Sequence, residues 1–497
     1  MKKAGVLMPV FSLPSPYGIG TLGGAAREFV DFLVAGGQSY WQILPLGPTG
    51  PGDSPYQSCS TYAGNPYLID LDDLTARQLL HPEEYQHLDW GTDGGAVDYQ
   101  QLFTLRIPVL RLACTRLEEK EGPALVQFCR EQGHWLEDYA LFMALKEAHG
   151  GLSWLDWPDG VRLRDGQALA RARNELAREL AFWQGVQYLF FSQWWALKGY
   201  ANGRGLSILG DLPIYVALDS ADVWANPGQF QLDGQGYPTE VAGCPPDGFT
   251  TDGQLWGNPL FDWYKMCEDG YRWWLDRLAA QFHMYDALRI DHFRGFDAYY
   301  SIPYGAEHAR VGRWQTGPGL PFFRAVEAKL GRREIIAEDL GFLTPSVHQL
   351  RMDMGYPGMK VLEFAFDSWD AGSDYLPHRY EPNCVVYAGT HDNNTILGWL
   401  TTAPEQQVAF AKAYLRLSEC EGYHWGMMRA AWASPANLAV MQMQDILGLG
   451  GQARINTPAT VGANWRWRLL PGQCTPELAG QLHREMQVYQ RLPNRGQ

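Results

Sequence analysis

Eight short apolar runs alternate with segments of helical character, and this alternation constrains the fold of the chain more than any other feature. Apolar runs of four to eight residues bounded by glycine and polar clusters are typical of buried strands. Strands that alternate with helices favour a parallel sheet, and eight of them favour a (β/α)8 TIM barrel. The runs, with the residues that end them, are 5–11, 39–46, 205–211, 287–292, 334–339, 359–366, 385–393 and 438–443.

Two long segments interrupt the alternation. At 497 residues the chain exceeds one compact core of ordinary size, so we expect a single barrel domain over 1–497 with large insertions. Residues 70–204 contain helical patterns at 124–148 and 169–200, which predicts a helical insertion between the second and third barrel strands. Residues 219–259 are rich in Gly, Pro, Asn and Asp, and we expect a lid-like loop there, after the third strand.

Charge and cysteine usage exclude several classes of function. A formal net charge of -15 argues against nucleic acid or an anionic membrane as a partner. The eight cysteines have no CxxC spacing, so neither a zinc site nor a disulfide framework is indicated. The first apolar run is broken by Pro9 and Pro14, which makes a poor signal peptide, and no stretch approaches the length of a spanning helix. We therefore expect a cytoplasmic protein.

Aromatic residues are abundant, with 20 Trp, 25 Tyr and 21 Phe. Any single one is more often part of the core than of a site. Trp and Tyr also offer a flat apolar face beside a hydrogen-bonding edge, and the C–H faces of sugar rings pack on such surfaces. In an acidic chain with clustered carboxylates, this surplus favours a carbohydrate substrate.

Three of the apolar runs lead into the acidic residues Asp291, Glu338 and Asp392. A charge at the end of a buried strand does not help the core, because burying it unpaired is expensive. In parallel barrels the carboxyl ends of the strands carry the catalytic groups. Glycoside cleavage needs one carboxylic acid to protonate the leaving oxygen and one carboxylate on the other side of the anomeric carbon.

The neighbours of these acids suggest a role for each. Arg289 lies two residues before Asp291 on the same strand, so both side chains point the same way, and a nearby cation keeps a nucleophilic aspartate ionised. Glu338 follows an apolar run, and partial burial would raise its pKa, as a proton donor requires. Asp392, beside His391, could hold sugar hydroxyls and favour a positively charged transition state.

Two other interpretations stay open at this point. A lone aspartate at a strand end is more often a helix cap or a salt-bridge partner than a catalytic group. Hard donors at strand ends could also form a zinc site, although no HxH pair or HExxH motif accompanies them. A metal assay separates this interpretation from the glycosidic one. The candidate donors are Asp211, His292, Asp339, His391 and Asp392.

Nine segments, in order along nearly the whole chain, resemble the 4-alpha-glucanotransferase family, the amylomaltases or disproportionating enzymes related to the alpha-amylase superfamily. The resemblance implies a barrel with inserted subdomains and no separate C-terminal β domain. It also implies transfer of an α-1,4-glucan segment to the 4-hydroxyl of an acceptor. The matching segments are 12–20, 54–58, 63–69, 210–216, 242–247, 256–259, 289–295, 337–341 and 389–393.

The same resemblance implies roles for single residues. By their motifs, Asp291 is the nucleophile, Glu338 the acid/base and Asp392 the stabiliser of the transition state. Positions that hold the sugar, at the cleavage point or further along the glucan, are Ser54, Tyr56, Asp211, Trp256, Arg289, His292, His391 and Asn464. We expect no metal ion and no cofactor, because these carboxylates and histidines are interpreted as sugar contacts.

One departure from the family concerns the lid. After residues 245–247 some members carry an aromatic residue, where this chain has Gly248 before Phe249. The departure leaves open how tightly the lid holds a long glucan and whether large rings form. A hydrolase with the same carboxylates is the nearest alternative function. An inactive glucan-binding protein is another, although binding alone does not need the three acids.

Overall fold

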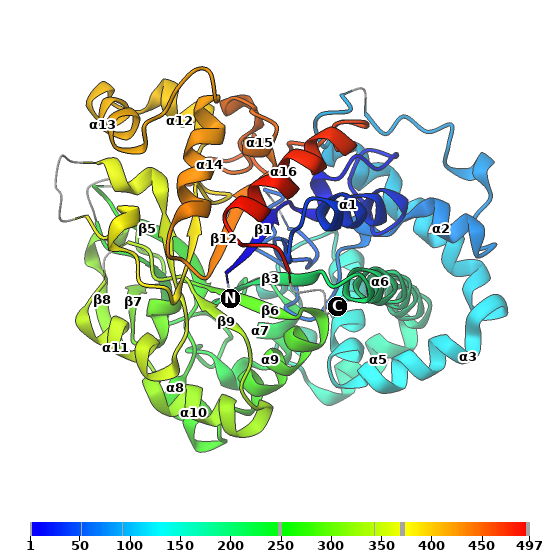
Figure 1. Ribbon diagram of the computed structural model, residues 1–497. Helices are drawn as coiled ribbons and strands as arrows, with labels where there is room; N and C mark the ends of the chain where they lie inside the picture. Colours follow the sequence, from blue (N-terminus) through cyan, green and yellow to red (C-terminus); the bar gives the residue numbers. More distant parts are fainter. Residues whose placement is uncertain are drawn as a thin grey trace.

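Eight parallel strands form the centre of the molecule (Figure 1). The computed structural model describes residues 2–50, 52–91, 93–246, 251–341, 343–367 and 373–493. The strands follow the order β10-β11-β12-β1-β2-β3-β6-β9. They are β1 (Lys3–Leu7), β2 (Tyr40–Gln42), β3 (Ser207–Pro213), β6 (Ala287–Asp291), β9 (Ile335–Ala337), β10 (Gly358–Val361), β11 (Cys384–Tyr387) and β12 (Leu438–Gln442).

The two edges of this sheet meet. The N–H of Ala337 in β9 donates a hydrogen bond of 2.9 Å to the carbonyl of Pro357, just before β10. Side chains such as Trp41, Ile290 and Val386 are fully buried in the strands. The sheet therefore forms a nearly closed barrel, and the predicted TIM barrel is confirmed.

Helices surround the barrel. The helix α1 (Gly24–Ala35) buries Ala26, Phe29, Val30 and Leu33, whose three- and four-residue spacing places them on one face. It packs against α16 (Pro476–Val488), as Figure 1 shows. The other covering helices are α8 (Trp263–Glu268), α9 (Arg272–Met284), α10 (Gly319–Leu330), α11 (Pro345–Met354), α12 (Ile396–Thr402), α13 (Glu405–Leu415) and α14 (Tyr423–Ala433).

A group of helices lies between β2 and β3 in the chain and to one side of the barrel in Figure 1. The longest, α3 (Tyr99–Ala148), packs along α6 (Ala177–Gly203) and bends at Glu121. The bend precedes Gly122 and Pro123, and proline lacks the N–H that a continuous helix needs. The helical pattern from 124 onwards is thus only the second half of this helix. The others are α2 (Leu71–Ala76), α4 (Asp159–Arg162) and α5 (Gly166–Glu175).

A second, antiparallel sheet was not expected from the sequence. It has the order β5-β4-β7-β8, and two of its strands, with α7 (Ala221–Ala225), lie within the segment 219–259 that the sequence predicts as a loop. The pairing of β4 with β5 is irregular in register, and β4 pairs with β7 across about 60 residues of chain, so local periodicity did not reveal the sheet. The strands are β4 (Glu240–Cys244), β5 (Gln254–Pro259), β7 (Ala298–Pro303) and β8 (Arg313–Thr316).

Several barrel strands are shorter than predicted: the run 5–11 forms β1 only as far as Leu7, and the run 39–46 forms β2 only over Tyr40–Gln42. The run 359–366 forms β10 only as far as Val361, and Leu362–Phe366 is a 3-10 helix. Leu362, Ala365 and Phe366 are all buried, and an apolar run alone does not distinguish a strand from a buried helical turn.

The chain ends in helices rather than strands. From Met443 to Pro493 the described residues form α15 (Met443–Ile446), a 3-10 helix at Gly451–Ala453 and α16, and they contain no strand. Within the described ranges, no helix is both long and apolar enough to cross a membrane.

Candidate active site

The carboxyl ends of β3, β6, β9 and β11 bring most of the predicted site residues together. Arg289 in β6 lies at their centre, with one guanidinium nitrogen 2.8 Å from each carboxyl oxygen of Asp211. The same nitrogen is 3.0 Å from Oδ1 of Asp291. Residues 289 and 291 face the same side because side chains alternate along a strand, as the sequence predicts.

Burial and the neighbouring charges shift the pKa of Arg289 in opposite directions. The side chain of Arg289 is only 4% exposed. Burial alone would lower its pKa, but the carboxylates of Asp211 and Asp291 outweigh burial and hold the pKa well above the ordinary value. Arg289 is therefore a permanent cation in contact with the carboxylate of Asp291.

Glu338 has a different environment, directly after β9. Its two carboxyl oxygens accept main-chain N–H groups, from His292 at 2.7 Å and from Leu340 at 2.9 Å. Burial raises the pKa of Glu338 to about 7, and the negative charge of Asp291 adds to this rise against the effects of Arg289 and the two N–H groups. Near neutral pH this carboxyl group can hold and release a proton, as predicted from the apolar run before it.

His292 turns the chain at the end of β6. Its φ of 53° is left-handed, a conformation uncommon for residues other than glycine. Its ring meets Trp256 of β5 edge to face, with the centroids 4.8 Å apart. Burial lowers the pKa of His292 to about 4, so the ring is neutral at neutral pH. Its buried Nε2 has no hydrogen-bond partner among the described residues.

Asp392 lies in the loop after β11 and is 45% exposed. Nδ2 of Asn456 donates a hydrogen bond of 2.6 Å to its Oδ1, and Nε2 of His391 lies 3.4 Å from the same oxygen. Arg454 donates to the main-chain carbonyl of Asp392. The sequence did not indicate Arg454 or Asn456, because they come from a loop after β12 with no strand-end or spacing signal.

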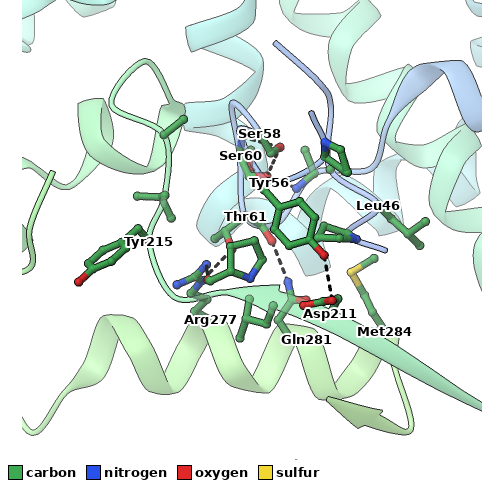
Figure 2. A pocket seen from close by; sticks show the side chains of 18 of the residues that line it. Leu46, Tyr56, Ser58, Ser60, Thr61, Asp211, Tyr215, Arg277, Gln281 and Met284 are labelled. Atoms are coloured by element: carbon green, nitrogen blue, oxygen red, sulfur yellow. Dashed lines mark hydrogen bonds between the residues drawn. The ribbon is translucent and has the colours of Figure 1, made fainter. Parts of the chain in front are cut away.

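Aromatic rings form one side of the site. Tyr56 stacks on His391 with the centroids 5.2 Å apart, and its hydroxyl donates a 3.0 Å hydrogen bond to Asp211. Trp465 lies beside both rings. Figure 2 shows the Tyr56 hydroxyl pointing to Asp211 at a small cavity of about 40 Å³, whose lining also includes Arg277 and Gln281. A cavity of this size holds no more than a few water molecules.

Ser54 and Asn464 have local hydrogen bonds. The Ser54 hydroxyl oxygen accepts the N–H of Tyr56 at 3.3 Å. The Asn464 side chain is bonded to Thr457 and Thr460, within its own turn. Sugar contact by Asn464 stays a prediction, while the adjacent Trp465, which the sequence did not indicate, lies against Tyr56. The predicted lid residues Gly248 and Phe249 lie outside the described residues.

Asp339, one candidate ligand of the alternative metal site, is engaged in other interactions. Oδ1 of Asp339 accepts the N–H of Met359 at 2.7 Å, and Oδ2 pairs with Arg351 at 3.1 Å, so Asp339 ties β9 to β10. In the described part of the chain, no group of three or more His, Cys, Asp or Glu residues could hold a metal ion.

Comparisons with known proteins identify the family of the chain. The model of the 4-alpha-glucanotransferase family matches residues 8–473. The 4-alpha-glucanotransferase of Clostridium butyricum is 46% identical over 486 residues, covering 97% of this chain and 100% of the relative. That of Thermus thermophilus is 47% identical over 499 residues, covering 98% of this chain and 99% of the relative.

A solved structure agrees as closely. The amylomaltase from Streptococcus agalactiae, in complex with acarbose, is 41% identical and superposes with a TM-score of 0.97, covering 99% of this chain and 100% of that one. Similarity of this extent, over nearly the whole chain, shows that the chain belongs to the 4-alpha-glucanotransferase family of transglycosylating enzymes.

Proposed function

We propose that the protein moves a segment of an α-1,4-glucan to the 4-hydroxyl of a second glucan or of glucose by a retaining double displacement. One observation supports this most directly: Asp291 is ion-paired with Arg289, while burial keeps the pKa of Glu338 near neutrality. Two carboxyl groups in such different environments can act as nucleophile and proton donor on one bond.

In the first step, a carboxylate oxygen of Asp291 attacks the anomeric carbon. The bond from that carbon to the glycosidic oxygen breaks, and Glu338 gives its proton to this oxygen, so the departing chain leaves with a free 4-hydroxyl. Asp392 stabilises the positive charge that develops on the sugar between the two events. The products are a glycosyl ester on Asp291 and an ionised Glu338.

In the second step, Glu338 takes the proton of the incoming 4-hydroxyl. The hydroxyl oxygen bonds to the anomeric carbon, the ester bond breaks, and Asp291 is released as a carboxylate. Both catalytic groups regain their starting forms. The anomeric configuration is inverted twice and is therefore retained.

The remaining residues hold the sugar in this proposal. The neutral ring of His292 offers its unpaired Nε2 to a sugar hydroxyl, which would satisfy a buried polar atom. Tyr56 and Trp256 present aromatic surface to the sugar ring. Acarbose is a suitable probe of this site, because the amylomaltase from Streptococcus agalactiae was solved in complex with it. The further contacts are assigned to Ser54, Asp211, Arg289, His391 and Asn464.

The wider assignments are also part of the proposal. Residues 70–204 form an inserted helical subdomain, and residues 219–259 form a lid that keeps water from the glycosyl ester. The enzyme acts on maltooligosaccharides and longer α-1,4-glucans in cytoplasmic carbohydrate metabolism. Its net charge of -15 supports neither a nucleic-acid nor a membrane partner.

Maltotriose tests transfer against hydrolysis. Transfer exchanges one α-1,4 bond for another, so glucose and a ladder of longer maltooligosaccharides form while the number of reducing ends stays nearly constant. Hydrolysis creates a reducing end at every event. A rise of reducing ends in step with maltotriose loss, without longer chains, would show that the protein is a hydrolase. Absence of any product, with acarbose still bound, would favour a glucan-binding protein.

A further inference from the structure

Thr61, in the loop after β2, is held by three buried side chains that the proposed reaction does not use. Its N–H donates a 2.7 Å hydrogen bond to Oδ2 of Asp222 in α7. From α9, Nε of Arg277 donates to the Thr61 hydroxyl and Nε2 of Gln281 donates to its carbonyl, both at 2.8 Å (Figure 2). The residues Asp222, Arg277 and Gln281 are 4%, 1% and 5% exposed. Both main-chain groups of Thr61 and its hydroxyl oxygen are therefore fixed from two helices.

Arg277 also holds the end of β3. Its Nη1 donates a 2.8 Å hydrogen bond to the carbonyl of Ile214, and its Nη2 donates one of 2.7 Å to the carbonyl of Pro213. With Nε bonded to Thr61, the three nitrogens of one guanidinium group join the loop after β2 to the end of β3. The planar guanidinium supplies such a fork of donors, whereas a lysine ammonium has a single nitrogen.

The two segments that Arg277 joins meet again inside the candidate site. Tyr56 lies in the same loop as Thr61, and Asp211 lies in β3 just before Pro213. The Tyr56 hydroxyl donates a 3.0 Å hydrogen bond to Oδ2 of Asp211, as Figure 2 shows. A shift of the loop relative to β3 would lengthen this bond, so the grip of Arg277 bears directly on it.

The burial of Arg277 needs a specific reason, because a buried charge is expensive unless its donors are satisfied. Burial lowers the pKa of Arg277 to about 10, so the guanidinium is still charged at neutral pH. It lies over the ring of Trp274, 4.6 Å from the centroid. An apolar side chain of similar volume would cost less to bury, so the three acceptors that the arginine fixes explain its presence.

We propose that Arg277 positions Tyr56 against Asp211 by fixing Thr61 relative to the end of β3. It is a positioning residue, because it acts through Tyr56 and Asp211. The effect on sugar binding rests on the contact proposed for Tyr56, whereas the effect on the bond between Tyr56 and Asp211 does not.

The variant R277K tests the fork of donors, because lysine keeps the charge but cannot reach three acceptors with one nitrogen. We expect acarbose to bind about tenfold more weakly or worse, and kcat to fall about 10- to 100-fold, since small displacements in a site cost this much. Calorimetry measures the binding, and circular dichroism verifies that the variant folds. Unchanged acarbose binding in folded R277K would overturn the proposal.

The matched control is R491K. Arg491 is 0% exposed and also donates to main-chain carbonyls, among them those of Trp432 and Lys3. Lys3 begins β1, at the end of the barrel opposite to the site. R491K should therefore lower the melting temperature and leave acarbose binding unchanged. An equal weakening of acarbose binding in R277K and R491K would show general damage and overturn the proposal.

A milder variant, T61V, decides the question if R277K does not fold. It removes the hydroxyl that accepts from Arg277, and acarbose should bind about three- to tenfold more weakly, the range of one hydrogen bond. In a Y56A background there is no tyrosine left to position, so T61V should have no further effect. T75V is the control, because the Thr75 hydroxyl pairs with that of Tyr85 in the helical insertion. Equal effects of T61V with and without Y56A would overturn the role of Arg277.

A crystal structure of the T61V protein tests the placement without any sugar. We expect the Tyr56 hydroxyl to lie beyond hydrogen-bond distance, about 3.5 Å, from the Asp211 carboxyl group. An unchanged bond would overturn the proposal. This structure and the acarbose measurements need no turnover, so a hydrolytic product pattern from maltotriose would contradict the proposed function and leave both results standing.

Discussion

The main-chain N–H of His292 donates a 2.7 Å hydrogen bond to the carboxyl group of Glu338. Because His292 directly follows Asp291, this bond joins the end of β6 to the end of β9 and fixes the two proposed catalytic carboxyl groups relative to each other. The left-handed φ of 53° at His292 is part of this arrangement. A strained backbone at such a point is typical of functional sites.

The first prediction concerns the nucleophile. Asp291→Asn should lower kcat by about 10⁴-fold or more, because the amide does not form the glycosyl ester. Acarbose binding, measured by calorimetry, should survive. Asp276→Asn on the surface of α9, where the side chain is 55% exposed, is the matched control and should keep full activity. Substantial activity in the Asp291→Asn protein would assign the nucleophile to another group.

The second prediction separates the acid role of Glu338 from simple damage to the site. Glu338→Gln should remove activity on natural glucans, whose leaving oxygen needs a proton. It should spare the first step on a glycosyl fluoride, because fluoride leaves without one. Rapid-mixing release of fluoride measures that step. If the substitution slows both donor types equally, Glu338 is not the proton donor.

The third prediction concerns the pH dependence of the reaction. The first step requires protonated Glu338, whose pKa is about 7. For natural donors kcat/KM should therefore fall as pH rises through this value, about tenfold per pH unit well above it. With a glycosyl fluoride, release of fluoride should not show this alkaline fall. A flat alkaline limb with natural donors would contradict the assignment.

The fourth prediction concerns stability. Burial raises the pKa of Glu338 in the folded protein above its unfolded value, so the folded state binds the proton more tightly. The contribution of this proton to the free energy of unfolding is present at low pH and is lost as pH rises through about 7. Glu338→Gln should therefore raise the melting temperature at pH 8 more than at pH 5. Calorimetric scans at both values test this, and an equal shift at the two values would contradict it.

The fifth prediction concerns Asn456, which donates to Asp392 at 2.6 Å. Asn456→Ala should lower kcat about 10- to 100-fold, because Asp392 loses the bond that orients it. Asn464→Ala is the matched comparison, since its side chain is bonded within its own turn. If Asn464 also contacts sugar, this variant should raise KM with little change in kcat. A larger loss of kcat in Asn464→Ala than in Asn456→Ala would reverse the two roles.

The barrel and its reactive edge were predictable because their signals are local. A buried strand needs a short apolar run, and a charge at its end marks the edge where Asp291 and Glu338 lie. The side on which Arg289 faces Asp291 follows from alternation along one strand. Local signals of this kind do not fix where a run ends, and β10 accordingly stops at Val361 rather than continuing to residue 366.

By itself, the sequence determined the barrel, the three acids at its strand ends and the resemblance to a family. Only the tertiary structure decided which distant groups act on them: Asn456 and Arg454 reach Asp392 from the loop after β12, and Trp465 lies against Tyr56. It also decided the second sheet and the burial that raises the pKa of Glu338. Periodicity reports how each segment meets its own neighbours, whereas desolvation and cross-strand contact depend on segments that are tens to hundreds of residues away in the chain.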